Sequence, residues 1–178
     1  GDLGRGLLDV ADRQGFADEL RRVCHEVGFF RLVDHGVDPA FLADYFGALR
    51  AFFALPDTDK TQIDKINSPW FRGWERVGAE LTDNSIDHRE QIDVWSELDP
   101  RGDTRGAEYL RLEGPNQWPD EETSPRFRAL VERFQSEMGA LADQLLEAMC
   151  LGLGLAPDHL AAAFGPRRMS LVKLIHYP

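Results

Sequence analysis

Cysteine is scarce in this chain of 178 residues, which contains only Cys24 and Cys150. Both fall in apolar helical patterns and neither belongs to a Cys-x-x-Cys pair, so no cysteine-based zinc or redox motif is present. The expected case is a reduced, cytoplasmic protein with buried thiols, although the residues alone also leave one disulfide open.

Long apolar runs and an excess of positive charge are also missing. No hydrophobic stretch has transmembrane length, and no signal peptide is expected at the start of the chain. The 31 acidic residues outnumber the 20 Lys and Arg residues and give a formal net charge of −11. Nucleic acids and anionic membranes attract basic faces, so we expect neither as a partner. An acidic surface also keeps ordinary soluble proteins in solution, and therefore names no partner by itself.

The common catalytic motifs are absent too, including His-Glu-x-x-His and the Gly-x-Ser-x-Gly elbow. His88-Arg89-Glu90 has the His-x-carboxylate form that supplies two of the three ligands in a facial Fe(II) site. The third ligand would be His159 or His176. Because Arg89 stands between the two supposed ligands, a charged strand entrance is the favoured interpretation.

Apolar residues make up 43% of the chain, enough for the core of one domain. Helical spacing predicts a first helix over Gly15–Val27 and a second that begins at Pro39, behind an N-cap at Asp38, and stops before Pro56. The longest predicted helix runs over Ser124–Leu151 and begins by the same cap-plus-proline logic. Shorter helices are expected after Asp57 and over Pro157–Phe164.

Two strands are predicted from apolar runs. Gly28 ends the first helix, and the aromatic and aliphatic run Phe29–Val33 that follows is expected in the core, with His35 capping a turn. Met169–Tyr177 is also strand-like, and its apolar residues on both faces suggest burial on both sides. The charged, glycine-bearing stretch Asp99–Glu113 is expected to be a surface loop.

A polar strand is predicted within Asp87–Trp95. Alternate residues of a strand face opposite sides, so Gln91, Asp93 and Trp95 would share one face, with Ile92 and Val94 on the other. A polar face with one aromatic suits the wall of a cavity. The same pattern describes a strand with one solvated face, which the pattern alone slightly favours.

Several short motifs, taken in order, resemble a known family. They are E-V-G-F-F-R-L-V-D-H-G-V, F-F-A-L-P-D-T-D-K, F-R-G-W, G-P-N-Q-W-P, L-G-L-G-L-A-P-D-H-L and the closing V-K-L-I-H-Y-P. Together they resemble the N-terminal part of the isopenicillin N synthase-like oxygenases, which are non-haem iron enzymes and mostly depend on 2-oxoglutarate. Each motif alone has little specificity, but their occurrence in the family's order argues against chance similarity.

The resemblance implies an α+β fold, with a helical N-terminal part and the first strands of a double-stranded β-helix, or jelly roll. Residues 1–120 would form the N-terminal non-haem dioxygenase region. Residues 121–178 would supply a long helix, a short helix and the first strand leading into the barrel. The family's iron ligands, His-x-Asp and a later His, follow the Tyr-Pro at 177–178. We therefore expect no metal ligand and no catalytic residue within this chain.

The implied activity uses Fe(II), 2-oxoglutarate and O2 to oxidise a C–H bond of a small molecule, with succinate and CO2 as products. Hydroxylation, desaturation and cyclisation are all open outcomes. Two alternatives remain: a non-catalytic binding module that lacks the iron site, and an oxidase of the same family that uses no 2-oxoglutarate. The sequence does not indicate an oligomeric state.

The resemblance also assigns site residues. Tyr177 matches a tyrosine whose hydroxyl reaches the 2-oxoglutarate or substrate carboxylate in relatives, with barrel packing as the alternative. Arg72 would grip a substrate carboxylate in bidentate fashion, or else pair with an acidic neighbour. For Gln91, Asp93 and Trp95, the resemblance shifts the balance towards lining a substrate cavity.

Overall fold

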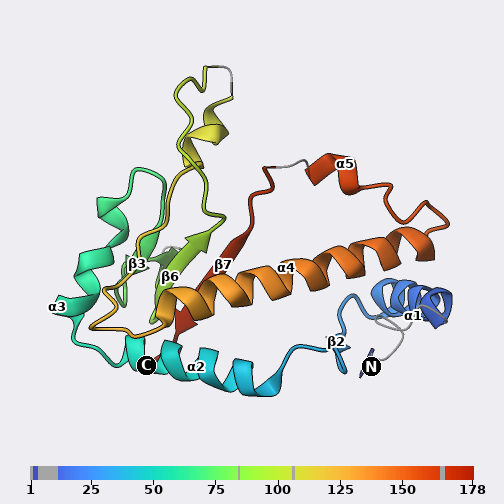
Figure 1. Cartoon of the computed structure of the whole chain (residues 1–178), viewed down its shortest axis with the longest axis horizontal. Coiled ribbons are helices and arrows are strands. Elements are labelled where there is room, and N and C mark those ends of the chain that lie inside the picture. Colours follow the sequence, from blue (N-terminus) through green and yellow to red (C-terminus); the bar gives the residue numbers. More distant parts are fainter. Residues whose placement is uncertain (1, 4–11, 84, 106, 165–166) are drawn as a thin grey trace. The chain divides into compact units, whose positions relative to one another are not determined.

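The computed structural model describes residues 2–3, 12–83, 85–105, 107–164 and 167–178 (Figure 1). These residues form two compact units, one within 1–42 and 134–166 and the other within 43–133 and 167–178. Two of the three boundaries fall inside the two longest described helices, α2 (Pro39–Phe53) and α4 (Phe127–Gly152). Each unit thus combines early and late parts of the sequence. The expected division at residue 120 remains a prediction.

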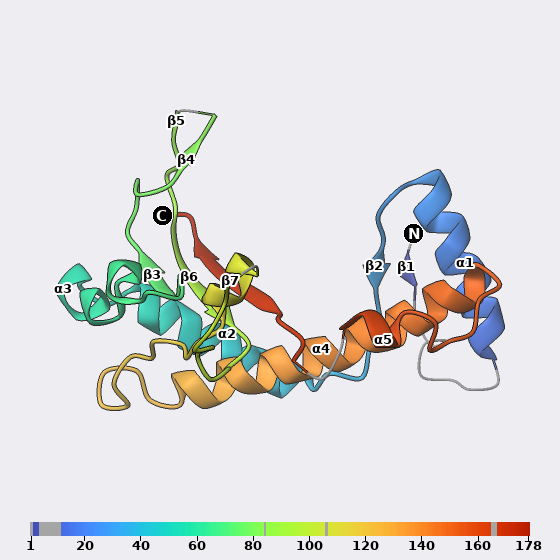
Figure 2. The ribbon, with the colours of Figure 1, turned by 90° about the horizontal axis from the view of Figure 1, so that it is seen from above.

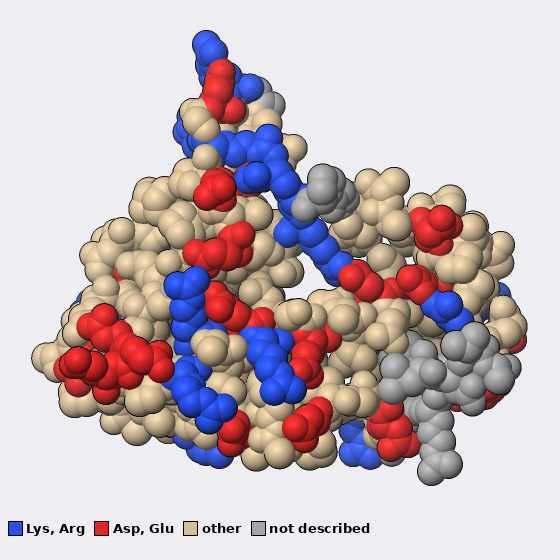
Figure 3. All heavy atoms as spheres, viewed as in Figure 1, with Lys and Arg blue, Asp and Glu red and all other residues tan. Residues whose placement is uncertain are grey.

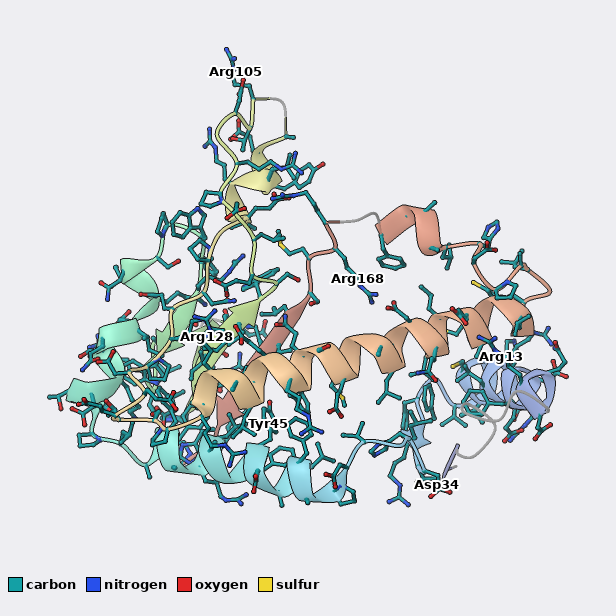
Figure 4. The ribbon with its side chains drawn as sticks, viewed as in Figure 1. Arg13, Asp34, Tyr45, Arg105, Arg128 and Arg168 are labelled. Carbon is teal, nitrogen blue, oxygen red and sulfur yellow. The ribbon has the colours of Figure 1, made fainter. Side chains whose placement is uncertain are left out.

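The first unit is built on helix α1 (Arg13–Glu26), which confirms the predicted first helix to within two residues. Phe16, Ala17 and Leu20 form a buried cluster with Ala148 of α4. A Cβ at Gly152 would lie 2.6 Å from the Ala17 carbonyl oxygen, so glycine allows this close approach. Arg13 pairs with Glu147 across the same contact, and Figure 4 shows Arg13 between the two helices.

The stretch after α1 differs from its prediction. Gly28 ends the helix at φ +88°, and its N–H donates to the Val23 carbonyl at 3.1 Å. Only Arg31–Leu32 then forms strand β2, which pairs in parallel with β1 (Asp2–Leu3). Phe29 is 76% exposed, so its predicted place in the core is wrong, because it lies in the link before this short strand.

Two smaller predictions in the first unit have different outcomes. The backbone N–H of Val37 donates to His35 Nδ1 at 3.2 Å, which confirms that His35 caps a turn. The predicted helix over Pro157–Phe164 is shorter than expected, because helix α5 covers only Ala161–Phe164.

Helix α2 starts as predicted, since Asp38 Oδ1 accepts a hydrogen bond from the Ala40 N–H at 2.9 Å. Its C-terminal Phe52 is buried in the second unit, with its ring centroid 5.1 Å from that of Phe127. Three short helical segments follow: α3 (Asp57–Lys60), η2 (Thr61–Ile63) and η3 (Lys65–Asn67). The helix expected after Asp57 is therefore confirmed.

Helix α4 starts later than predicted. It begins at Phe127, and Ser124 Oγ has no hydrogen-bond partner among the described residues. Arg126 adopts φ +62°, which is incompatible with a helix, and its N–H donates to Glu121 Oε1 at 2.7 Å. The local turn therefore replaces the predicted Ser124 cap.

A three-stranded antiparallel sheet dominates the second unit. Its order is β3 (Gly73–Glu75), β6 (Glu90–Trp95) and β7 (Leu171–His176), with β6 in the middle. The short strands β4 (Leu81–Thr82) and β5 (Ser85–Ile86) form a hairpin between β3 and β6 (Figure 2). The predicted surface loop contains η4 (Glu108–Leu112), and Arg105 lies at its far end in Figure 4.

The two faces of this sheet have different character. One face carries buried Trp74, Ile92, Val94 and Leu174, and His176 on that side stacks on Phe53 at 5.4 Å. Leu171 and Ile175 face the other way and are 38% and 41% exposed. The expectation that β7 is buried on both sides is therefore wrong for the described chain, in which the second face of this edge strand is uncovered.

Gly73 has a conformation that other residues adopt only with strain. Its φ is +115°, and a Cβ there would lie 2.2 Å from the Ile63 carbonyl oxygen. We predict that Gly73→Ala lowers the free energy of unfolding by about 2–3 kcal/mol, measured by urea denaturation. Gly47→Ala is the control: this helical position has open space, and alanine there should stabilise by up to about 1 kcal/mol. If both substitutions changed the free energy of unfolding equally, the strain assigned to residue 73 would be contradicted.

Candidate functional site

Most of the predicted site residues lie on the face of the sheet opposite Trp74, Ile92 and Leu174. The register pairs Asp93 with Lys173, Gln91 with Ile175, and Trp95 with Leu171. Along its other edge, β6 pairs with β3, where Glu75 lies opposite Gln91. The predicted alternation along β6 is confirmed. We call this side of the sheet the polar face and define it by Glu75, Gln91, Asp93, Trp95, Lys173 and Tyr177.

A buried ion cluster holds the middle of the polar face. Lys65 Nζ lies 2.6 Å from Asp93 Oδ2 and 2.8 Å from Glu75 Oε2, and Gln91 Nε2 donates to the same Glu75 oxygen at 2.7 Å. Burial lowers the pKa of Lys65, but hydrogen bonds to Asp93 and Glu75 outweigh it and raise the pKa above its ordinary value. Lys65 is therefore charged across the physiological range. Lys173 Nζ lies 3.8 Å from Asp93 Oδ1.

Arg72 lies at the Trp95 end of this face and is fully buried. Its guanidinium donates to the carbonyl oxygens of Trp70 and Leu112 and lies 5.0 Å from the Trp95 ring centroid. Burial lowers the pKa of Arg72, and the charges of Glu97 and Asp93 only partly offset this effect. Neither predicted role, carboxylate binding or an acidic partner, is seen directly. Backbone carbonyls fix the side chain.

The four residues predicted to meet substrate share a further property. Each has a buried polar atom without a hydrogen-bond partner among the described residues: Arg72 Nε, Gln91 Oε1, Asp93 Oδ1 and Trp95 Nε1. Buried polar atoms are rarely left unpaired, because an unmade hydrogen bond costs about 1–3 kcal/mol. Arg72 Nε and Trp95 Nε1 are donors and Gln91 Oε1 and Asp93 Oδ1 are acceptors, so these four side chains keep hydrogen-bonding capacity that their described neighbours do not use.

Tyr177 lies just beyond the last paired residue of β7. It is 63% exposed, and its hydroxyl accepts a hydrogen bond from Arg89 NH1 at 3.3 Å. Arg89 in turn pairs with Glu80 at 2.5 Å and with Asp87 at 3.3 Å. The hydrogen bond with Glu80, followed by that with Tyr177, raises the pKa of Arg89.

A cavity of about 550 Å³ adjoins the ion cluster. Lys65 and Glu75 line it, and the Lys65 ammonium lies 4.2 Å from the Phe71 ring centroid. Its other lining residues are Asp64, Ile66, Ser68, Phe71, Arg76 and Ala79.

Figure 3 shows basic and acidic side chains interleaved on the visible surface rather than segregated by sign.

Lys65 and Glu75 were not predicted as site residues. Glu75 had a usable signal. It lies two residues after Gly73 in a strand-like segment, and alternate residues of a strand face the same side, so Glu75 and Gly73 share a face. Lys65 had none, because its place depends on a partner 28 positions along the chain.

The His88–Glu90 pattern does not form a metal site in this structure. The Glu90 carboxylate lies on the opposite side of β6 from the polar face and accepts hydrogen bonds from Lys60 Nζ at 2.8 Å and Trp74 Nε1 at 2.9 Å. His176 Nδ1 lies 2.9 Å from its other oxygen. Within the described ranges, no group of three or more His, Cys, Asp or Glu side chains could hold a metal ion.

Glu90 provides a pH prediction. Burial raises its pKa, but hydrogen bonds from Lys60, His176 and Trp74 outweigh burial and lower the pKa below the ordinary value of 4.5. The stabilisation is therefore complete above pH 4.5 and is lost as pH falls through the lower, folded-state pKa. We expect urea midpoints to fall less steeply below that pH in Glu90→Gln than in the wild type. The exposed Glu132→Gln is the control and should follow the pH dependence of the wild type. If the urea midpoints of Glu90→Gln and the wild type fell equally steeply with pH, the prediction would be contradicted.

None of the helices in the described part of the chain is both long and apolar enough to span a membrane.

The comparison with known families agrees with this geometry. Residues 2–121 match the family described as non-haem dioxygenase in morphine synthesis N-terminal. This match covers more than half of the chain, and the chain therefore belongs to that family of non-haem dioxygenase N-terminal regions. The resemblance inferred from the short motifs is confirmed.

Curated relatives carry names of the same kind. A 2-oxoglutarate-dependent dioxygenase from Dothideomycetidae sp. is 31% identical over 166 residues, which are 93% of this chain and 44% of that protein. A homoarginine-6-hydroxylase from Glycine max is 31% identical over 173 residues, which are 97% of this chain and 49% of the relative. The chain spans about half the length of the curated relatives it matches.

Solved structures show the same fold. A 2OG-Fe(II) oxygenase family protein from Caulobacter crescentus superposes with a TM-score of 0.81 at 25% identity, covering 100% of this chain and 56% of that one. A full-length Neurospora crassa protein in complex with alpha-KG gives a TM-score of 0.79 at 21% identity, covering 99% of this chain and 54% of that one. The expected α+β class, a helical part followed by the first strands of a jelly-roll oxygenase, is confirmed.

Proposed function

We propose that the protein is a 2-oxoglutarate-dependent dioxygenase of which this chain is the N-terminal portion. It would use Fe(II) and O2 to oxidise a C–H bond of a small molecule. One observation carries the proposal. Gln91, Asp93, Trp95 and Tyr177, assigned to substrate and cosubstrate by the family resemblance, share the polar face of one sheet.

Tyr177 fits a role at 2-oxoglutarate. A phenolic hydroxyl both donates and accepts hydrogen bonds, and Arg89 already donates to this one, which leaves its O–H free to donate to a carboxylate. Gln91 and Asp93 would orient the substrate through their unpaired oxygens, with Trp95 as an aromatic wall held by Arg72. The iron ligands would come from residues that follow this chain. Bound iron and 2-oxoglutarate supply the oxidising chemistry, while the protein supplies binding and orientation.

The proposed substrate is a small polar molecule. The relative from Glycine max is named for homoarginine, and a Neurospora crassa structure contains thymine. Both molecules carry nitrogen-bound hydrogens and polar oxygens, which suit the mixed donors and acceptors of the polar face. A cytoplasmic location is part of the proposal and is supported by the free thiols of Cys24 and Cys150.

The test uses the complete protein, meaning this chain with the sequence that follows it in the longer polypeptide. Succinate and oxidised product are measured with Fe(II), 2-oxoglutarate and O2, using homoarginine and thymine as first probes. The proposal predicts succinate and oxidised product in equal amounts for a true substrate. Oxidised substrate without succinate would establish the 2-oxoglutarate-independent oxidase. A protein that neither binds 2-oxoglutarate nor consumes O2 would be the non-catalytic binding module.

A further inference from the structure

The pairing of β6 with β7 continues past the end of the ladder to Arg89 and Tyr177. The last ladder pair is Glu90 with His176, so the next residues, Arg89 and Tyr177, stand directly opposite each other. Their side chains point to the same side of the sheet as Gln91 and Ile175, because alternate residues share a face. Directly opposed side chains in an antiparallel pair have Cβ atoms about 4.5–5.5 Å apart, so the Arg89–Tyr177 contact follows from the register.

Arg89 is fixed more firmly than the tyrosine that it touches. Its side chain is 18% exposed and is held by the Glu80 and Asp87 carboxylates. These two residues flank the β4–β5 hairpin in sequence and meet at its base, where the Asp87 N–H donates to the Glu80 carbonyl. Tyr177 is exposed, and Arg89 donates a hydrogen bond to its hydroxyl. The guanidinium therefore acts as the fixed group and the phenol ring as the group to be oriented.

We propose that Arg89 is a positioning residue for Tyr177 in the binding of 2-oxoglutarate. By donating to the phenolic oxygen, Arg89 holds the ring in one orientation and leaves the O–H to donate to a cosubstrate carboxylate. This inference rests on the proposed function and adds to it a residue that the family resemblance did not assign.

A structural role for Arg89 is the competing explanation. Through Glu80 and Asp87 it also ties the β4–β5 hairpin to the sheet. Loss of that tie would alter folding stability, but its effect would not depend on the Tyr177 hydroxyl. A double-mutant cycle separates the two roles, because only residues that act through each other give non-additive effects.

The experiment measures the dissociation constant of 2-oxoglutarate by calorimetric titration of the complete protein, loaded with Fe(II) in the absence of O2. Arg89→Met keeps the apolar stem and removes the donors, and is expected to weaken binding about 10-fold, the scale of one hydrogen bond to a charged group. Arg89→Lys keeps one donor and should lose less. Arg105→Met, at an exposed arginine on the surface loop, is the matched control and should leave binding unchanged.

The decisive comparison is with Tyr177→Phe, which is also expected to weaken binding about 10-fold. The double variant Arg89→Met/Tyr177→Phe should bind about as weakly as either single variant, rather than about 100-fold more weakly than the wild type. An additive double variant, or Arg89→Met with wild-type affinity, would overturn the positioning role. If Arg89→Met does not fold, Arg89→Lys in the wild-type and Tyr177→Phe backgrounds gives the same comparison.

Failure of the proposed function has a different signature. A wild-type protein with iron bound that shows no 2-oxoglutarate affinity would overturn the proposed function and this inference together. A wild-type protein that binds 2-oxoglutarate while Arg89→Met binds it equally well would overturn the inference alone. The unfolding midpoint of each variant shows whether any loss of affinity comes from lost structure.

Discussion

Replacing Glu90 with alanine is expected to lower the free energy of unfolding by about 3–5 kcal/mol, because it leaves a buried ammonium without its main partner. Lys60 and Glu90 are almost completely buried, and their charged atoms lie 2.8 Å apart. The same carboxylate accepts from Trp74 and contacts His176, so alanine removes three partners at once. Asp57 also pairs with Lys60, at 3.0 Å, but it is exposed and replaces little of the lost interaction.

Urea unfolding of the complete protein measures this effect. The matched control is Glu132→Ala, which breaks an exposed pair with Arg128 and should cost at most about 1 kcal/mol. A Glu90→Ala variant that is as stable as the control would show that Glu90 is not a centre of the fold. That result would also remove the structural explanation for the His-x-carboxylate pattern at His88.

Lys65→Met is expected to cost a similar amount, about 3–5 kcal/mol, because it leaves the buried Asp93 carboxylate and the partly buried Glu75 carboxylate with no positive charge at hydrogen-bond distance. Asp93 is nearly inaccessible, and both Asp93 and Glu75 depend on the same ammonium. Since this cluster fixes the middle of the polar face, the variant should also raise the KM for substrate in the complete protein.

A second substitution tests the reason for that effect. Adding Asp93→Asn to Lys65→Met removes one of the unbalanced charges and should recover part of the lost stability. The two changes would then be strongly non-additive in urea unfolding. If the double variant were less stable than Lys65→Met by the full cost of Asp93→Asn alone, the ion cluster would not be the source of the stability.

Local signals predicted much of the architecture. The Asp38-Pro39 pair placed the start of α2 correctly, because N-capping depends only on neighbouring residues. Gly28 likewise ends α1 in the left-handed conformation that glycine adopts freely. Alternation along β6 gave the correct faces, since it depends only on the geometry of a strand.

Other features depend on partners far along the chain and could not be read locally. Ser124-Pro125 looks like a helix start. However, the Arg126 N–H donates to the Glu121 carboxylate and Arg126 has a positive φ, so α4 begins only at Phe127. The burial of Lys60 and Lys65 follows from acidic partners 30 and 28 positions away, respectively. Nothing in the sequence near either lysine distinguishes it from a surface lysine.

The candidate site shows the same division. Four of the five residues carried over from the family resemblance lie together on the polar face, and the fifth, Arg72, lies against the Trp95 ring. Their roles towards ligands stay predictions. Arg89 entered the site only through the register of β6 with β7, which no local pattern determines. In the sequence alone, Arg89 only argues against a metal site at His88 and Glu90.

A crystal structure of the complete protein with iron, 2-oxoglutarate and a substrate tests the central claim most directly. The claim is that the polar face borders the reaction chamber. We predict the Tyr177 hydroxyl at a hydrogen-bond distance of about 2.5–3.0 Å from a carboxylate of 2-oxoglutarate or substrate, with the substrate beside Gln91, Asp93 and Trp95. Ligands bound elsewhere, with the polar face covered by apolar side chains, would contradict it.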